Sequence, residues 1–354
     1  MADINPQSYA IVAVIPAYNV EGKIESVLSA LPPYLRHIIV VDDCSPDGTG
    51  KLVERACRQE RRIVLIRHAK NQGVGAAMIT GFGKALELQA QIVLKIDGDG
   101  QMSDYDPRRL LAPLIAGEAD YAKGNRFRDF KALKAMPPLR RIGNMALGFL
   151  VKAATGYWDC FDPTNGFIAI RGDVLSLLPL EKVQQSYFFE TSMLGELYLL
   201  GAVIKDVPYP AYYGDEKSNL SIRRILAEFP PKLLFLLLRR MFIKNLLVDF
   251  SMESVYLLVG APMLLLGLIF GIVKWIKYAQ LGIAAPTGTI MIAVLSVMLG
   301  VQILLAAIGI DLQATPKKPI CNGPLPPSRG AHGQKSVRRI QKDLCRCNPK
   351  GAGG

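Results

Sequence analysis

Residues 91–101 read Gln-Ile-Val-Leu-Lys-Ile-Asp-Gly-Asp-Gly-Gln, an apolar run that ends in two closely spaced aspartates. The run Gln91–Ile96 predicts a strand, and Asp97 and Asp99 follow it directly. Side chains two residues apart in an extended segment point the same way, so these two carboxylates can converge on one hard divalent cation. The glycine between them lets a diphosphate approach the backbone. A lone Asp-x-Asp is more often a solvated turn, so the neighbouring segments decide its meaning.

Further β-branched runs precede and follow this one, and longer stretches suited to helices separate the early runs. Apolar strands connected by helices predict an α/β fold, a mostly parallel sheet with helices on both faces. The helical stretches are Glu21–Leu31, Thr49–Glu60 and Gly73–Leu88. The other strand candidates are Ala10–Ile15, His37–Val41, Ile63–Arg67, Tyr121–Lys123, Phe167–Ile170 and Val203–Val207.

Polar residues follow the predicted strands at the edge where parallel sheets bind ligands, outside the carboxyl ends of the strands. Residues 16–19, Pro-Ala-Tyr-Asn, follow the first strand, and residues 42–49, Asp-Asp-Cys-Ser-Pro-Asp-Gly-Thr, follow the second. Acidic side chains therefore gather at the same edge as Asp97 and Asp99. In this setting we interpret the aspartate pair as a site for Mg²⁺ or Mn²⁺ together with a phosphate.

The basic excess of the chain is confined to its C-terminal part. Residues 1–219 contain 25 basic and 25 acidic side chains, and residues 251–314 contain 2 of each. Residues 220–250 contain 6 basic and 2 acidic side chains, and residues 315–354 contain 9 and 1. The large N-terminal part thus has no basic excess to release phosphate counterions, so we expect no nucleic acid partner.

Two uncharged segments lie between the basic regions. Ser254–Val273 is 20 residues long, which spans about 30 Å as a helix, and Tyr278–Ile310 is 33 residues long. We expect transmembrane helices at about 254–276 and 287–311, the alternative being two buried helices of a soluble domain. By the positive-inside rule we expect the α/β part and both termini to be cytoplasmic, in an integral protein of the cytoplasmic or endoplasmic reticulum membrane.

Four regions follow from these patterns. Residues 1–219 form the α/β domain, and residues 251–314 form the two spans. Residues 220–250 mix basic and bulky apolar residues around Pro230-Pro231, which predicts two amphipathic helices lying on an anionic membrane surface. Residues 315–354 are rich in proline, glycine and basic residues, and we expect them to be disordered.

Five motifs, taken together and in order, resemble those of the inverting GT-A glycosyltransferases. They are residues 16–19 (Pro-Ala-Tyr-Asn), 41–49 (Val-Asp-Asp-x-Ser-x-Asp-Gly-Thr), 71–75 (Asn-x-Gly-x-Gly), 97–101 (Asp-x-Asp-x-Gln) and 124–126 (Gly-Asn-Arg). Within that group the chain is most similar, over residues 8–314, to polyprenyl-phosphate sugar synthases with two C-terminal spans. The resemblance implies a GT-A fold and transfer of a hexose from a UDP- or GDP-sugar to a polyprenyl phosphate.

The resemblance also implies roles for individual residues. Metal binding falls to Asp99 and Gln101, with Asp97 and Gly98 contacting the nucleotide and the sugar phosphate. The nucleoside is implied to contact Pro16, Tyr18 and Asp43. Arg126 and Lys217 would contact the donor phosphates or sugar, and Asp162 lies where the family places an acidic residue near the acceptor. Glu190 would order the site, and Arg223 and Arg224 belong to the basic segment expected to attract the lipid phosphate.

The sequence departs from the family pattern at two places, and two other functions compete with sugar transfer to a polyprenyl phosphate. Val20 stands where the family usually has glutamate, and Tyr212 and Tyr213 stand near the usual position of an arginine. A processive polysaccharide synthase would carry a Gln-x-x-Arg-Trp motif, which neither Trp158 nor Trp275 provides. The second competitor is an inactive nucleotide-sugar-binding scaffold in the membrane. Related two-span proteins suggest a homo-oligomer.

Overall fold

The structure is a computed structural model that describes residues 5–100, 106–126, 138–209 and 222–328. The chain divides into two compact units. The sheet unit comprises residues 1–149, 160–221 and 316–354, and the helical unit comprises residues 150–159 and 222–315. In this division the stretch Ile222–Thr315 places the basic segment in the same unit as the apolar helices. The four regions expected from sequence stay a prediction.

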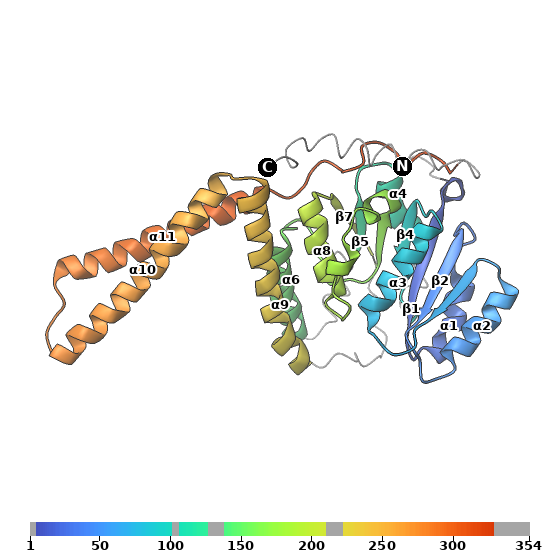
Figure 1. The fold of residues 1–354 in the computed structure, drawn as a ribbon, viewed down its shortest axis with the longest axis horizontal. Coiled ribbons are helices and arrows are strands. Elements are labelled where there is room, and N and C mark those ends of the chain that lie inside the picture. The colour runs from blue at the N-terminus through green and yellow to red at the C-terminus, as the bar shows by residue number, and fades with distance from the viewer. Residues whose placement is uncertain (1–4, 101–105, 127–137, 210–221, 329–354) are drawn as a thin grey trace, which may run out of the picture. The chain divides into compact units, whose positions relative to one another are not determined.

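The sheet unit is built on seven strands in the order β3-β2-β1-β4-β6-β5-β7 (Figure 1). β6 runs antiparallel to its neighbours β4 and β5, and the remaining pairs are parallel. All seven strands expected from sequence are present, and the mostly parallel sheet is confirmed. The strands are β1 (Ile11–Ala17), β2 (His37–Asp42), β3 (Ile63–Arg67), β4 (Ile92–Lys95), β5 (Tyr121–Asn125), β6 (Ile168–Arg171) and β7 (Ile204–Pro208).

Helices cover both faces of this sheet. Side chains alternate between the two faces along each strand, so each face has apolar residues that pack against helices. On one face Ile11, Ala13 and Ile15 of β1 join a core with residues of α1, α2 and α4. On the other face Val14 of β1 meets α3, where a Cβ added to Gly81 would lie 2.2 Å from its methyl group. The elements of the sheet unit outside the strands are η1 (Pro6–Ser8), α1 (Glu21–Ala30), α2 (Thr49–Gln59), α3 (Val74–Glu87), α4 (Arg108–Ile115), α7 (Gly172–Leu175), η3 (Leu180–Lys182) and α8 (Phe189–Leu200). The helix α6 (Pro138–Thr155) contributes to both units.

The basic segment before the apolar helices is not the expected pair of helices. It forms one continuous helix, α9 (Ile222–Phe242), that contains Pro230 and Pro231, and a π-helical segment, η4 (Ile243–Val248). A proline in a helix interior costs about 3 kcal/mol or more. The turns that follow bury Leu233 and Leu236, and this packing stabilises the helix despite the missing backbone donors.

Two long apolar helices complete the helical unit, α10 (Met252–Leu281) with 30 residues and α11 (Thr287–Gln313) with 27. Both are long and apolar enough to cross a membrane, and only 11% of the apolar window of each is buried. Two buried helices of a soluble domain would be mostly covered, so this exposure favours the two expected spans. The pair packs closely through glycines, since a Cβ added to Gly300 would lie 2.7 Å from the backbone nitrogen of Leu264.

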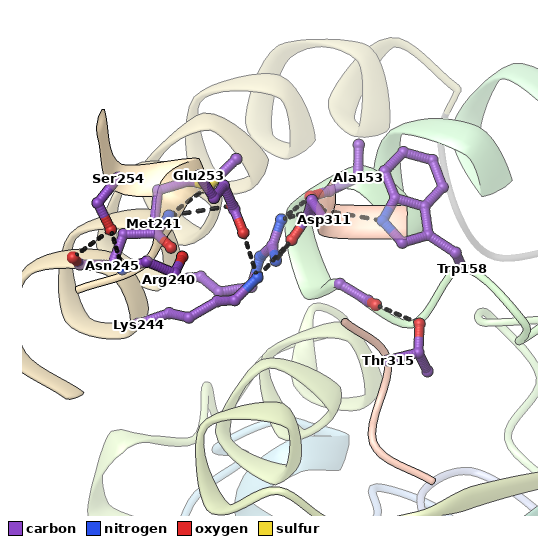
Figure 2. Close-up of polar contacts among 12 residues, drawn as sticks. Ala153, Trp158, Arg240, Met241, Lys244, Asn245, Glu253, Ser254, Asp311 and Thr315 are labelled. Carbon is purple, nitrogen blue, oxygen red and sulfur yellow. Dashed lines mark hydrogen bonds and ion pairs between the residues drawn. The ribbon is translucent and has the colours of Figure 1, made fainter. Parts of the chain in front are cut away.

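A buried network of charged side chains joins the first turn of α10 to the last turns of α11 (Figure 2). The Asp311 carboxylate accepts hydrogen bonds from Arg240 at 2.7 and 2.9 Å, from Lys244 at 3.0 Å and from the Trp158 indole at 3.1 Å. Lys244 also lies 2.8 Å from Glu253. Two cations and two anions balance one another, as burial of charge requires.

The chain after α11 does not begin as the disordered tail expected from composition. In the sheet unit, Ile320 N–H donates to Asp120 at 2.9 Å and Leu325 N–H donates to Ile115 at 2.9 Å. Leu325 is buried in the sheet core, and Arg171 donates to the Gly323 carbonyl at 3.3 Å. Residues 316–328, named here the return segment, are thus anchored by backbone hydrogen bonds that composition does not reveal. Residues 329–354 lie outside the described part of the chain.

Candidate active site

The carboxyl ends of β2, β1 and β4 lie side by side, since Ala17 at the end of β1 pairs with Asp42 at the end of β2 and β1 also pairs with β4. β5 runs in the same direction, and the antiparallel β6 enters the sheet at this edge. The segments after β1, β2, β4 and β5 and the segment before β6 therefore converge on one edge, named here the rim. The expectation that the polar segments share an edge is confirmed.

The loops after β1 and β2 are held against each other by backbone-to-side-chain hydrogen bonds. Asn19 N–H donates to Ser45 Oγ at 3.2 Å, and Glu21 N–H donates to Asp47 at 3.0 Å. The Glu21 carboxylate in turn accepts from Gly48 N–H at 2.9 Å. Asn19 and Cys44 have positive φ values of 55° and 60°, a backbone state that costs energy and is common at functional sites. At the rim, the loops after β1 and β2 are therefore joined by hydrogen bonds.

Asp43 lies at the centre of a further set of hydrogen bonds. Its carboxylate lies 2.7 Å from His68 Nδ1 and accepts from Gly73 N–H at 2.7 Å and from Gln72 N–H at 3.0 Å. Gly73 has φ of 95°, and a Cβ there would lie 2.8 Å from the Gln185 carbonyl. Asp43 thus holds the start of α3 in place, and its contact with a nucleoside stays a prediction.

Asp97 is oriented by a buried lysine that precedes it by two residues. Lys95 Nζ lies 2.7 Å from Asp97 Oδ1 and 3.2 Å from Glu190 Oε1 in the first turn of α8. Burial alone would lower the pKa of Lys95, but the two carboxylates outweigh burial and hold that pKa above its ordinary value. The ammonium is therefore charged and bridges the aspartate motif to α8.

Backbone packs tightly around this motif. A Cβ on Gly98 would lie 3.3 Å from the Pro16 carbonyl, so the glycine permits close contact between the ends of β4 and β1. A Cβ on Gly166 would lie 2.5 Å from Lys95 Nζ and 2.8 Å from Asp97 Oδ2. Gly166 therefore covers the ion pair with bare backbone.

Arg126 and Asp162 form an ion pair at the rim. The guanidinium donates to the two carboxylate oxygens at 2.7 and 3.0 Å, and Arg126 N–H donates at 3.2 Å. Asp162 is fully buried, whereas the Arg126 side chain is partly exposed. The family resemblance implies separate roles for these two residues. Their pairing indicates that Asp162 orients the Arg126 guanidinium.

A second buried lysine fixes the loop that carries Asp162 and Gly166. Lys123 on β5 donates to the backbone carbonyl of Asn165, and the Asn165 amide donates to the Gly124 carbonyl at 2.7 Å. Burial lowers the pKa of Lys123 below its ordinary value. Lys95 and Lys123 both lie opposite Ile168 of β6, so they occupy matching positions on the two strands that flank β6.

The structure brings together most of the site residues expected from sequence, and some lie outside its description. At the rim are the side chains or backbone of Pro16, Tyr18, Asp43, Asp97, Gly98, Asp99, Arg126, Asp162 and Glu190. Tyr18 is half exposed, as a residue available for stacking would be. Gln101 and Lys217 lie outside the described residues, as do the side chains of Arg223 and Arg224 in α9.

The sequence analysis did not identify Lys95, Lys123, Asn165 or His68. The available signal was a lysine inside an otherwise apolar strand, at position 95 and again at position 123. Such a residue must be paired when buried, and its partner then belongs to the same site.

The donor atoms at the rim fit a divalent cation that also binds a substrate phosphate. Within the described ranges no three His, Cys, Asp or Glu side chains form a metal cluster. Asp97 is paired with Lys95, so the expected metal ligands are Asp99 and Gln101. Both residue types bind metals through oxygen atoms. Mg²⁺ and Mn²⁺ prefer oxygen and are often held by one or two protein ligands with phosphates completing the shell.

A mostly parallel α/β sheet with an acidic pair after β4 and a paired arginine after β5 fits the GT-A fold expected from sequence. Residues 12–178 match the model of glycosyl transferase family 2. A UDP-N-acetylglucosamine–dolichyl-phosphate N-acetylglucosaminyltransferase of Methanococcus voltae is 33% identical over 178 residues, which cover 47% of this chain and 70% of the relative. The chain belongs to the family 2 glycosyltransferases.

Two further relatives align over a longer part of the chain. A polyprenol monophosphomannose synthase of Mycolicibacterium smegmatis is 29% identical over 213 residues, covering 58% of this chain and 78% of the relative. An undecaprenyl-phosphate mannosyltransferase of Micrococcus luteus is 27% identical over 201 residues, covering 56% of this chain and 82% of the relative.

Proposed function

We propose that this glycosyltransferase moves a hexose from a nucleotide-diphosphate sugar to a polyprenyl phosphate at the cytoplasmic side of a membrane, with inversion at the anomeric carbon. The observation that carries the proposal is the presence, on one chain, of the family 2 rim and of two exposed apolar helices of 30 and 27 residues. An enzyme anchored in this way meets acceptors that reside in the membrane. The three relatives described above support this acceptor, since their names include dolichyl, polyprenol or undecaprenyl lipids.

Donor binding is assigned to the loops after β1, β2 and β4. Pro16, Tyr18 and Asp43 would contact the nucleoside, and Asp97 and Gly98 would contact the nucleotide and the sugar phosphate. UDP and GDP are both compatible with this rim, and so are several hexoses, because one hydroxyl group more or less leaves no readable motif.

A divalent cation at Asp99 and Gln101 would act as a Lewis acid on the departing nucleoside diphosphate. The protein's own cations act beside it. Arg126, held by Asp162, would direct its guanidinium to the donor phosphates or sugar, and Lys217 would contribute from the loop after β7. Preorganised donors of this kind stabilise developing negative charge at no cost of reorganisation during the reaction.

The acceptor needs little activation. A phosphate monoester is anionic near pH 7, so its oxygen can form the new bond to the anomeric carbon while the bond to the diphosphate oxygen breaks. Asp162 is engaged by Arg126 on both oxygens. We therefore assign it to orienting the arginine, with no proton transfer. The basic α9, including Arg223 and Arg224, would attract the lipid phosphate to the membrane surface. A homo-oligomer is compatible with this arrangement.

The metal assignment is tested by the variant Asp99→Asn. It removes a charged ligand while keeping the size of the side chain, and we expect Mn²⁺-dependent transfer to fall by roughly a hundredfold or more. The measurement is the rate of sugar transfer in membranes against Mn²⁺ concentration, with UDP- and GDP-sugars. Full metal-dependent transfer by the variant would contradict the assignment.

A further inference from the structure

Lys95 is the last residue of β4 (Ile92–Lys95), whose other side chains are apolar. It lies on β4 between Leu94 and Ile96, and its side chain is 2% exposed. Burying an ammonium is costly unless anions pair with it. The carboxylates that pair with Lys95 therefore indicate the role of its charge.

Both partners of Lys95 belong to the rim. Asp97 follows two residues later in an extended segment, so its carboxylate lies on the same side of the chain, 2.7 Å from Nζ. Glu190 lies 95 residues further on, in the first turn of α8, 3.2 Å from Nζ. One cation thus links the aspartate motif after β4 to a helix from the second half of the sheet unit.

The backbone at Gly166 limits the space around the Lys95 ammonium and the Asp97 carboxylate. The chain at Gly166 passes so close that a Cβ would lie 2.5 Å from Nζ and 2.8 Å from Asp97 Oδ2. Lys123, opposite the same Ile168, is engaged by the Asn165 carbonyl. The two buried lysines therefore have separate tasks, one at the aspartate motif and one at the loop before β6.

We propose that Lys95 is a positioning residue of the transfer reaction, which holds the Asp97 carboxylate toward the donor diphosphate and fixes it to Glu190 on α8. This inference rests on the proposed function, because it gives Asp97 a donor to contact. Without the ammonium, two carboxylates face each other in a site of low polarity, and Asp97 turns away from the position in which it meets the donor. A bridge that only stabilises the fold would instead leave donor binding unchanged.

The test compares the wild-type chain with Lys95→Met and Lys95→Gln in detergent. Calorimetry measures the dissociation constant of UDP or GDP, whichever the wild type binds, with and without Mn²⁺, and initial rates give KM and kcat for the sugar donor. We expect Lys95→Met to raise the dissociation constant and KM by about tenfold or more, because small displacements of a reacting group have large effects. Lys95→Gln, which keeps a hydrogen-bond donor and lacks the charge, should raise them by a smaller factor.

A second change separates charge from packing. Lys95→Met/Glu190→Gln removes the repulsion between the Asp97 and Glu190 carboxylates, so nucleotide affinity should recover part of the loss. The matched control is Lys205→Met, which removes a lysine of the same sheet whose Nζ pairs with Glu118 on the surface. Its nucleotide affinity should stay within about twofold of the wild type.

The outcomes are distinct. Lysine 95 variants that lower the thermal unfolding midpoint but keep the wild-type dissociation constant and KM would overturn the inference, and so would failure of both single variants to fold. A wild-type chain that binds neither nucleotide and transfers no sugar would instead contradict the proposed function.

Discussion

At Gly166 the backbone passes directly over the ion pair between Lys95 and Asp97. The glycine has an ordinary backbone conformation, so alanine is excluded only by space. We predict that Gly166→Ala displaces the ammonium and the carboxylate and lowers kcat/KM for the sugar donor by about tenfold or more. Steady-state kinetics with varied donor concentration measures this effect.

The control for this substitution is Gly83→Ala in α3, where an added Cβ meets nothing within 4 Å. Alanine is favoured over glycine in a helix by about 0.5–1 kcal/mol, so Gly83→Ala should keep its activity and gain slightly in stability. Wild-type kcat/KM in Gly166→Ala would show that the ion pair does not need its present geometry.

At the residue scale, the acidic motif could be predicted because its members are neighbours in the sequence and follow an apolar strand. The partners of these residues could not. Lys95 reaches Glu190 on α8, and Arg126 reaches Asp162, because the sheet order places β4, β6 and β5 side by side. Strand order is a tertiary property that local patterns do not encode.

At the scale of elements, the network around Asp311 joins α9, η4, α10 and α11 within the helical unit (Figure 2). Asp311→Asn would leave Arg240, which is 1% exposed, without its charged partner. Breaking a buried pair from one side costs about 3–5 kcal/mol. We predict a clear fall in the thermal unfolding midpoint of the full chain in detergent, followed by circular dichroism.

Asp249→Asn is the matched control, because Asp249 lies near the same junction and is exposed. Its effect should stay within about 0.5 kcal/mol. The double change Arg240→Met/Asp311→Leu replaces the pair by apolar groups and should recover much of the lost stability. An unchanged midpoint in Asp311→Asn would mean that the network contributes nothing to the helical unit.

Most elements could be predicted from periodicity and apolar runs, and the seven strands and two long helices were. The basic segment was the exception. Pro230-Pro231 indicated a break, yet α9 runs through both prolines, because burial of Leu233 and Leu236 adds tertiary stabilisation that local propensity does not include.

At the scale of the whole molecule, the return segment shows the limit of composition. Its proline- and lysine-rich sequence predicted disorder, but Leu325 inserts into the sheet core and its own N–H donates to the Ile115 carbonyl. The N–H of Ile320 donates to Asp120. We predict that Leu325→Ala destabilises the sheet unit by about 2–5 kcal/mol. Hydrogen–deuterium exchange of the full chain should show faster exchange in peptides from α4 and β5.

Asn322→Ala, an exposed position in the same segment, serves as the control and should leave exchange unchanged. Equal exchange in Leu325→Ala and the wild type would mean that the return segment does not stabilise the sheet unit.

The basic excess of the chain is concentrated outside the sheet unit's balanced N-terminal part. The 25 basic and 25 acidic side chains of residues 1–219 balance one another, and all six basic side chains of residues 220–250 lie in α9 and η4. Two of the six, Arg240 and Lys244, pair with Asp311 and Glu253, and the excess available to a membrane surface lies in α9. Under the proposed function this excess seats a neutral transferase next to an anionic lipid acceptor.

The most direct test of the central claim is the identity of the labelled product. Membranes containing the wild-type chain or Asp99→Asn are incubated with Mn²⁺, a short polyprenyl phosphate and radiolabelled UDP- or GDP-hexoses, and the organic phase is analysed. We expect label in a polyprenyl-phosphate hexose with one of the donors, only for the wild type and only when the lipid phosphate is added. Binding of a nucleotide sugar without label in the lipid, for every donor, would contradict it.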